Sequence, residues 1–284
     1  MPIRGKSINL FLMDGTASGR IKCTLANWTG VAYKIPKILL DKCNEIKYLK
    51  QSGVYFLFGT DSDENPAVYI GQAGVRKNKE GLLYRIKEPH NSIDYWTEAV
   101  MFTTTNDSFG PTEISYLENR FCNLALAANR YKVKNANDPN PGNLTEEKES
   151  EMEEFIDYAK IVMGTLGHRI FVPYITPDSS ADDNEPILYF AKASCPAKGQ
   201  RTSEGFVVLK GSTISQQTVK SCPESAIRDR KKFADKIGAD YILTKDILFG
   251  SPSAAAAFVG GSSLSGNELW KTIEGVPLKD LDCK

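Results

Sequence analysis

Two tyrosines in neighbouring apolar runs are the first residues with chemistry to offer. The run GVYFLFG at residues 53–59 is rich in aromatic residues and predicts a strand, and AVYIG at residues 67–71 predicts its antiparallel return. Because side chains alternate along a strand, Tyr55 and Tyr69 can project from one face of this hairpin. A phenol can orient or deprotonate a water molecule, although packing is the ordinary role of tyrosine in a strand.

Two charged residues follow the hairpin. Arg85 lies in LLYRIKE, which predicts a short helix over about residues 81–88. Glu118 lies in a helix predicted for residues 112–129, within the stripe where apolar residues recur every three or four positions. A carboxylate on an apolar face needs a partner. A metal ion would satisfy it, and an internal Arg85–Glu118 ion pair is the alternative.

In this order the residues resemble the signature of the GIY-YIG nucleases. Gly53-Val54-Tyr55 is followed by Tyr69-Ile70-Gly71, then by Arg85 and by the run Tyr116-Leu117-Glu118. The resemblance covers roughly residues 50–137. It implies an α+β fold in which a three-stranded antiparallel sheet is flanked by helices.

The resemblance also implies a reaction, the metal-dependent hydrolysis of DNA phosphodiester bonds. Glu118 would hold one Mg²⁺ or Mn²⁺, because such hard cations prefer oxygen ligands. Arg85 would stabilise the charge that develops on the phosphate. We favour Tyr55 as the base that deprotonates the attacking water and Tyr69 as its partner, although the sequence does not separate these roles. The genes that carry this architecture suggest restriction, phage defence or a mobile element.

Two further residues are candidates through the same resemblance. Asn135 matches an asparagine that supports the active site in the family, and a turn asparagine is the alternative. Many relatives place a histidine four residues after the arginine, whereas here His90 comes five residues after Arg85. His90 is therefore either a contact to the phosphate region or a surface-loop histidine.

Charge and turn signals divide the chain into four segments. We expect a ββα lead-in at residues 1–50, the nuclease domain at 51–138, an acidic helical connector at 139–186 and a C-terminal α+β accessory domain at 187–284. The net charge is +4 for residues 1–138, −8 for 139–186 and +4 for 187–284. The last block resembles a domain of unknown function that often follows GIY-YIG domains, and its basic cluster is a candidate DNA-binding arm: Arg228, Arg230, Lys231 and Lys232.

Composition narrows the remaining classes of protein. Apolar residues make up 41 % and charged residues 25 %, as in an average soluble protein. With no run of 18 apolar residues and no signal peptide, we expect a cytoplasmic protein without a membrane partner. The six scattered cysteines argue against a zinc site. Besides a DNA endonuclease, two alternatives stay open: a nucleic-acid-binding protein that does not cut, and a protein-interaction module that docks through the acidic helix at residues 145–163. The oligomeric state is open.

Overall fold

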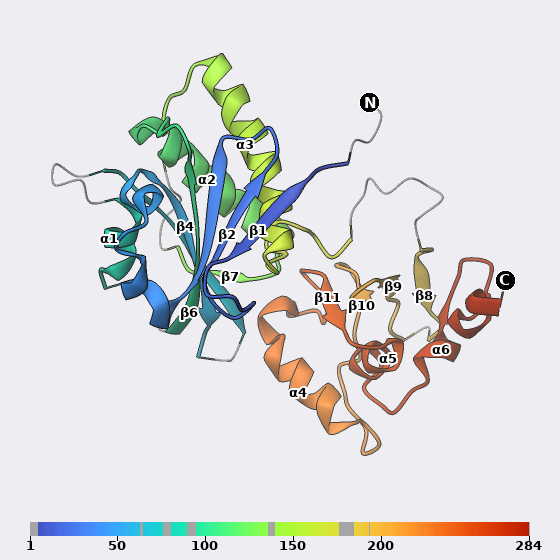
Figure 1. Cartoon of the computed structure of the whole chain (residues 1–284). Coiled ribbons are helices and arrows are strands. Elements are labelled where there is room, and N and C mark those ends of the chain that lie inside the picture. Colours follow the sequence, from blue (N-terminus) through green and yellow to red (C-terminus); the bar gives the residue numbers. More distant parts are fainter. Residues whose placement is uncertain are drawn as a thin grey trace. The chain divides into compact units, whose positions relative to one another are not determined.

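The computed structural model describes residues 5–62, 65–75, 81–89, 95–135, 140–175, 185–192 and 194–283. The chain divides into two units, Met1–Pro173 and Tyr174–Lys284 (Figure 1). This division differs from the four segments predicted from the sequence. The lead-in and the acidic helix belong to the same unit as the hairpin, because the lead-in strands join the sheet of the hairpin and the acidic helix packs against that sheet.

The first unit combines strands with α-helices and 3₁₀ helices. Its strands are β1 (Ile8–Leu12), β2 (Ile21–Leu25), β3 (Gly30–Pro36), β4 (Gly53–Thr60), β5 (Pro66–Ala73), β6 (Tyr95–Thr104) and β7 (Lys132–Val133). Its α-helices are α1 (Leu82–Lys87), α2 (Pro111–Ala128) and α3 (Glu146–Thr165), and its 3₁₀ helices are η1 (Lys37–Cys43) and η2 (Lys47–Lys50).

The sheet of this unit is larger than the three strands predicted. Over the described residues it has seven strands in the order β1-β2-β3-β6-β4-β5-β7. All neighbours are antiparallel except β5 and β7, which run parallel. The expected trio β5-β4-β6 lies inside this sheet. The lead-in extends it, because β3 pairs with β6 along its whole length. The predicted helix of the lead-in consists instead of the two 3₁₀ helices.

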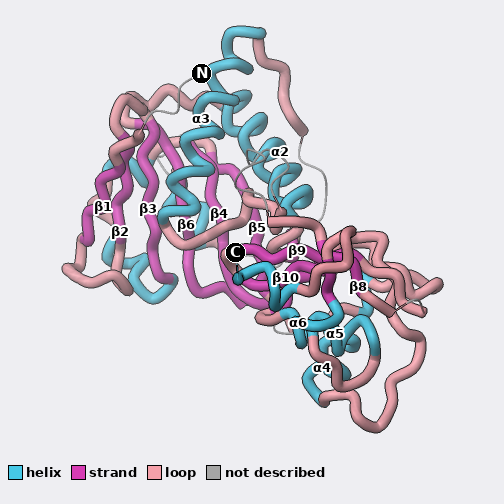
Figure 2. Tube along the Cα trace, turned by 90° about the vertical axis from the view of Figure 1, so that its right-hand side faces the viewer, coloured by secondary structure: helices cyan, strands magenta, loops and turns pink. Residues whose placement is uncertain are grey.

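Strand alternation gives this sheet two different faces. One face carries Val54, Phe56 and Phe58 of β4 and is covered by α2 and α3, as Figure 2 shows. The other face carries Tyr55 and Leu57 and packs against α1, η1 and η2. The side chains of β4 are therefore buried on both faces from Val54 to Phe58.

Helix α3 is the acidic helix predicted for the connector. Thr145 caps its first turn by accepting a hydrogen bond from the Lys148 backbone N–H. Its apolar side is buried against the sheet: Met152, Phe155, Ile156, Ala159, Val162 and Met163. The acidic side is not wholly solvated, because Glu153 pairs with Arg120 of α2.

The second unit has its own sheet and core. Its strands are β8 (Leu188–Phe190), β9 (Lys198–Thr202), β10 (Gly205–Val208), β11 (Ile247–Phe249) and β12 (Trp270–Lys271), and its helices are α4 (Glu224–Lys232), η3 (Ala234–Lys236), α5 (Pro252–Gly260), α6 (Gly266–Leu269) and η4 (Leu278–Cys283). The described strands form one antiparallel sheet in the order β11-β10-β9-β8-β12. The largest fully buried side chains of the second unit are Phe206, Phe258 and Trp270.

One residue of the predicted basic cluster, Arg230, holds elements of the second unit together. Arg230 is partly buried and donates hydrogen bonds to the backbone carbonyls of Ser215, Phe258 and Val259. The other three side chains of the cluster are exposed: Arg228, Lys231 and Lys232. Arg230 therefore joins α4 to the end of α5, and only these three remain as candidate phosphate contacts.

In the described part of the chain, no helix combines the length and the apolar character that a membrane span requires.

Candidate functional site

The two tyrosines of the predicted hairpin lie on the same face of the sheet. Tyr55 of β4 and Tyr69 of β5 both pack in the cluster that faces α1, and their ring centroids are 6.1 Å apart with 41° between the ring planes. They differ in exposure, since Tyr55 is 0 % exposed and Tyr69 is only partly buried. Of the two, only the Tyr69 ring can face a substrate from solvent.

Gly71 creates the space for the Tyr55 ring. The two residues are direct partners across β4 and β5. A Cβ atom added at Gly71 would lie 2.5 Å from both Cζ and the hydroxyl oxygen of Tyr55. Ordinary contacts between carbon atoms are about 3.5–4.0 Å long. The glycine of the second motif therefore lets the Tyr55 side chain lie across the neighbouring strand.

Arg85 lies in α1, on the same face as the tyrosines. Its neighbours Leu82 and Ile86 are buried in the cluster that contains Tyr55. The guanidinium forms an ion pair with Glu88 at the end of the helix. Burial would lower the pKa of Arg85, but the hydrogen bond that it donates to Glu88 and the nearby tyrosines leave that pKa above its usual value. Arg85 therefore remains a cation next to the tyrosine pair.

Glu118 approaches the same region from α2, which covers the other face of the sheet. Its Oε2 accepts a hydrogen bond of 2.9 Å from Nε2 of Gln72 in β5. Burial raises the pKa of Glu118, and neither this hydrogen bond nor the charge of Arg85 compensates fully. The carboxylate is thus partly desolvated and lacks full electrostatic compensation.

The site extends around the edge of the sheet at the end of β5. Tyr69 and Gly71 point to one face, while Gln72 points to the other and meets Glu118. In the described residues, β7 pairs with β5 only at Ala67 and Val68, so the later part of β5 has no strand on that side. The edge of β5 therefore connects the tyrosine face to Glu118 of α2 through the side chain of Gln72.

Asn135 has a structural contact in this site. Its Oδ1 accepts a hydrogen bond of 3.1 Å from the Ile70 N–H, and its Nδ2 donates one of 2.6 Å to the Ile70 carbonyl. The side chain thereby continues the edge pairing of β7 and fixes the backbone between Tyr69 and Gly71. The amide group positions the second motif, as an asparagine that supports the site would. His90, the other candidate, lies outside the described residues.

Two contacts of this site were not predicted from the sequence. Gln72 shares its face with Val68 and Ile70, so strand alternation could have placed it toward α2. Glu88 lies three residues after Arg85, which is a spacing that favours ion pairs on one side of a helix.

The electrostatics bear on the choice of base. Burial is the largest cause that raises the pKa of Tyr55, and the nearby Tyr69 and Glu118 raise it further against the charge of Arg85. The ionised form of Tyr55, which would accept a proton, is therefore disfavoured in this environment. The choice of Tyr55 rather than Tyr69 as the base stays a prediction, and of the two rings Tyr69 is the more exposed.

The donor set suits a hard divalent cation held by one carboxylate. Among the described residues, no group of three or more His, Cys, Asp or Glu side chains converges on one point. Mg²⁺ commonly needs only one or two carboxylates, with water and substrate phosphates as its other ligands. Glu118 fits such a site, because a nearby cation would favour the ionised form that burial disfavours.

Comparison with known proteins bears on the second unit alone. Residues 188–282 match the family model described as a domain of unknown function, DUF4357. This match is consistent with the resemblance noted for the C-terminal block, and it does not reach the tyrosine hairpin. Neither curated proteins nor solved structures show a match to this chain.

Proposed function

We propose that the first unit is a metal-dependent DNA endonuclease of the GIY-YIG type. The observation that carries this proposal is the tyrosine pair on adjacent antiparallel strands, with Arg85 in the helix that packs on the same face and Glu118 hydrogen-bonded to Gln72 of β5. A pair of tyrosines in a sheet is common by itself. An arginine and a carboxylate on two helices that cover opposite faces of the same strands add the charges that phosphoryl chemistry requires.

Each residue has a role that its environment favours. Arg85 keeps its positive charge and would bind the phosphate, stabilising the charge that develops as the ester bond breaks. Tyr69 is partly exposed and would orient and deprotonate the attacking water, while the buried Tyr55 supports its ring. Gln72 would orient Glu118 through their hydrogen bond.

Mg²⁺ or Mn²⁺ would be the cofactor, with Glu118 as its protein ligand. When bound, such an ion would supply Lewis-acid stabilisation of the phosphate and the leaving oxygen. Asn135 would hold the second motif in register through its two hydrogen bonds to Ile70.

The test is cleavage of supercoiled plasmid by the full chain with Mg²⁺, Mn²⁺ or EDTA. We expect nicking that requires the metal, and Glu118→Gln should reduce it at least about 100-fold while DNA binding survives. Glu151→Gln is the matched control, because Glu151 is exposed on α3 and pairs only with Lys148 among the described contacts. Mg²⁺ should also raise the unfolding temperature of the wild type but not that of Glu118→Gln.

Two results would contradict the proposal. DNA binding without cleavage in any metal would favour the non-cleaving alternative. Unchanged cleavage by Glu118→Gln would place the metal elsewhere, and Glu113 in the first turn of α2 would be the next carboxylate to substitute.

A further inference from the structure

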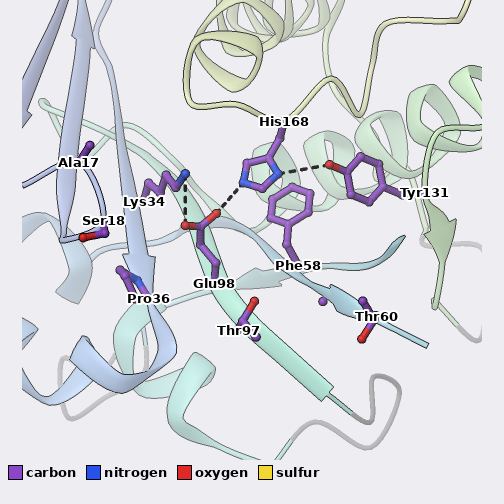
Figure 3. Close-up of a pocket in the computed structure, with 11 residues that line it drawn as sticks. Ala17, Ser18, Lys34, Pro36, Phe58, Thr60, Thr97, Glu98, Tyr131 and His168 are labelled. Carbon is purple, nitrogen blue, oxygen red and sulfur yellow. Dashed lines mark hydrogen bonds and ion pairs between the residues drawn. The ribbon is translucent and has the colours of Figure 1, made fainter. Parts of the chain in front are cut away.

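A second group of polar side chains surrounds a pocket of about 540 Å³ in the first unit (Figure 3). Small-molecule sites typically measure about 300–1,000 Å³. The walls come from β3, β4, β6, the turn between β1 and β2, and the segments that follow α2 and α3. The polar side chains among the lining residues include Ser18, Lys34, Thr60, Thr97, Glu98 and His168. The pocket shares none of these residues with the tyrosine site.

Glu98 is the centre of a hydrogen-bonded network in this pocket. Its Oε1 lies 2.7 Å from Nε2 of His168, and its Oε2 lies 3.2 Å from Nζ of Lys34. The Lys34 ammonium also donates to the Leu166 carbonyl at 3.1 Å. The His168 ring stacks on Phe58 with centroids 3.6 Å apart, so the imidazole is held in place. Charged side chains from two strands and an imidazole from the segment after α3 therefore converge at one wall.

An irregularity in β6 directs two neighbouring side chains into the same pocket. Phe58 pairs with Glu98 and the next residue, Gly59, pairs with Trp96, so Thr97 is an extra residue in β6. In a regular strand, Thr97 and Glu98 would point to opposite faces. Here both line the pocket. Such β-bulges redirect side chains and are over-represented beside active sites.

The charges of the pocket indicate what it can bind. Lys34 and Glu98 are opposite charges in contact, with side chains 19 % and 22 % exposed. Burial would raise the pKa of Glu98, but the hydrogen bond from His168 and the charge of Lys34 lower it, so this carboxylate stays ionised. An anionic ligand would meet Glu98 and a cationic one would meet Lys34. The balanced pair therefore favours a neutral ligand.

Hydroxyl groups match the donors and acceptors that remain. A carboxylate can accept about four hydrogen bonds, and an ammonium can donate three. The hydroxyls of Ser18, Thr60 and Thr97 both donate and accept. A ligand hydroxyl also does both, so a carboxylate beside an ammonium complements two adjacent hydroxyls.

We propose that this pocket binds a neutral vicinal diol, either a free sugar or the ribose of a nucleoside. Glu98 accepts hydrogen bonds from the two hydroxyls, and Lys34 and Thr97 donate to them. His168 acts as a positioning residue that orients Glu98. The proposal is independent of the nuclease function proposed above.

Titration of the full chain with D-ribose, adenosine and 2′-deoxyadenosine tests this assignment, with nuclear magnetic resonance of the His168 and Thr97 signals as the readout. We expect saturable shifts with a diol-bearing probe. Glu98→Gln should weaken its binding about 10-fold or more, because a hydrogen bond to a charged group is lost. Glu151→Gln on the exposed side of α3 is the control and should bind like the wild type.

The outcomes separate the two sources of the diol. Binding of adenosine but not of D-ribose assigns a nucleoside, and binding of D-ribose assigns a sugar. If Glu98→Gln fails to fold, Thr97→Val serves instead, because it removes a hydroxyl while keeping a β-branched side chain, and it should also weaken binding. Equal binding of adenosine and 2′-deoxyadenosine, no saturable shift with any probe, or unchanged affinity in the folded pocket variant would overturn the proposal.

Discussion

Replacing Gly71 by alanine tests whether the second motif is shaped around the Tyr55 ring. The added Cβ would lie 2.5 Å from Cζ and from the hydroxyl oxygen of Tyr55. That is about 1 Å closer than an ordinary contact. The Tyr55 ring is fully buried and cannot swing into solvent. The ring must therefore shift within the core, or one of the two strands must move.

The expected cost follows from this overlap. Overpacking a well-filled core typically costs about 1–3 kcal/mol. In a strand without such crowding, alanine would instead gain about 0.5–1 kcal/mol over glycine. We therefore expect Gly71→Ala to lower the free energy of unfolding by about 1–3 kcal/mol. For a unit of this size, each kcal/mol lowers the melting temperature by about 2–4 °C.

Gly74→Ala is the matched control, one residue after the end of the same strand. The nearest atom to its new Cβ is Cδ1 of Ile114 at 3.8 Å, which is an ordinary contact. Scanning calorimetry measures the loss, since a chain of two units need not unfold in one step. Hydrogen exchange of the β4 and β5 amides locates it.

A double-mutant cycle isolates the contact. In a Tyr55→Val background the ring is absent, so adding Gly71→Ala should cost no more than Gly74→Ala does in the wild type. Gly71→Ala with the stability of Gly74→Ala would refute the reasoning, as would an equal cost of Gly71→Ala with and without the Tyr55 ring.

Three further predictions concern stability. Folding raises the pKa of Glu118, so the contribution of Glu118 to stability falls as pH rises above the ordinary carboxyl pKa of about 4.3. Glu118→Gln should therefore be more stable than the wild type at pH 7. Folding lowers the pKa of Glu98, so the contribution of Glu98 to stability is present above the ordinary carboxyl pKa and is lost as pH falls. Glu98→Gln should therefore be less stable than the wild type at pH 7, and the difference should vanish in acid. Urea unfolding across pH 3–7 measures both variants, and a change in the free energy of unfolding at pH 7 with the same sign for Glu118→Gln and Glu98→Gln would contradict this reasoning. Arg230→Lys should destabilise the second unit by about 1–3 kcal/mol in calorimetry, because an ammonium cannot reproduce the planar set of donors with which the guanidinium reaches three carbonyls. Lys231→Ala, at an exposed position of the same helix, is the control and should change stability by less than about 0.5 kcal/mol. Equal effects of the two substitutions would refute the structural role of Arg230.

Local patterns were enough to predict the elements that carry the candidate site. Alternation over β4 and β5 placed the two tyrosines on one face, and the recurrence of apolar residues identified α2 and α3. The position of Glu118 also followed, because its place in the apolar stripe of α2 required a partner. These features depend on residues a few positions apart, which is the range over which strand and helix periodicity act.

Long-range pairing could not be read in the same way. β3 and β6 pair from Gly30 with Thr104 to Pro36 with Glu98, across a large separation in sequence. The short apolar run of β3 ends at Pro36, a residue that also favours the start of a helix. No local pattern indicates that two such distant runs pair as neighbouring strands. The sequence therefore predicted a separate lead-in where the structure has a continuous sheet.

The two glutamates of the first unit show why the same residue type supports different chemistry at two sites. Glu98 has a cation and an imidazole in direct contact, so its charge is already compensated and a second cation would meet Lys34. Glu118 has a neutral amide as its hydrogen-bond partner, and the charge of Arg85 acts on it without reversing the effect of burial. A divalent ion would supply the compensation that Glu118 lacks. The electrostatics thus favour a metal at the tyrosine site and a neutral, hydroxyl-bearing ligand at Glu98, although both carboxylates belong to one sheet unit.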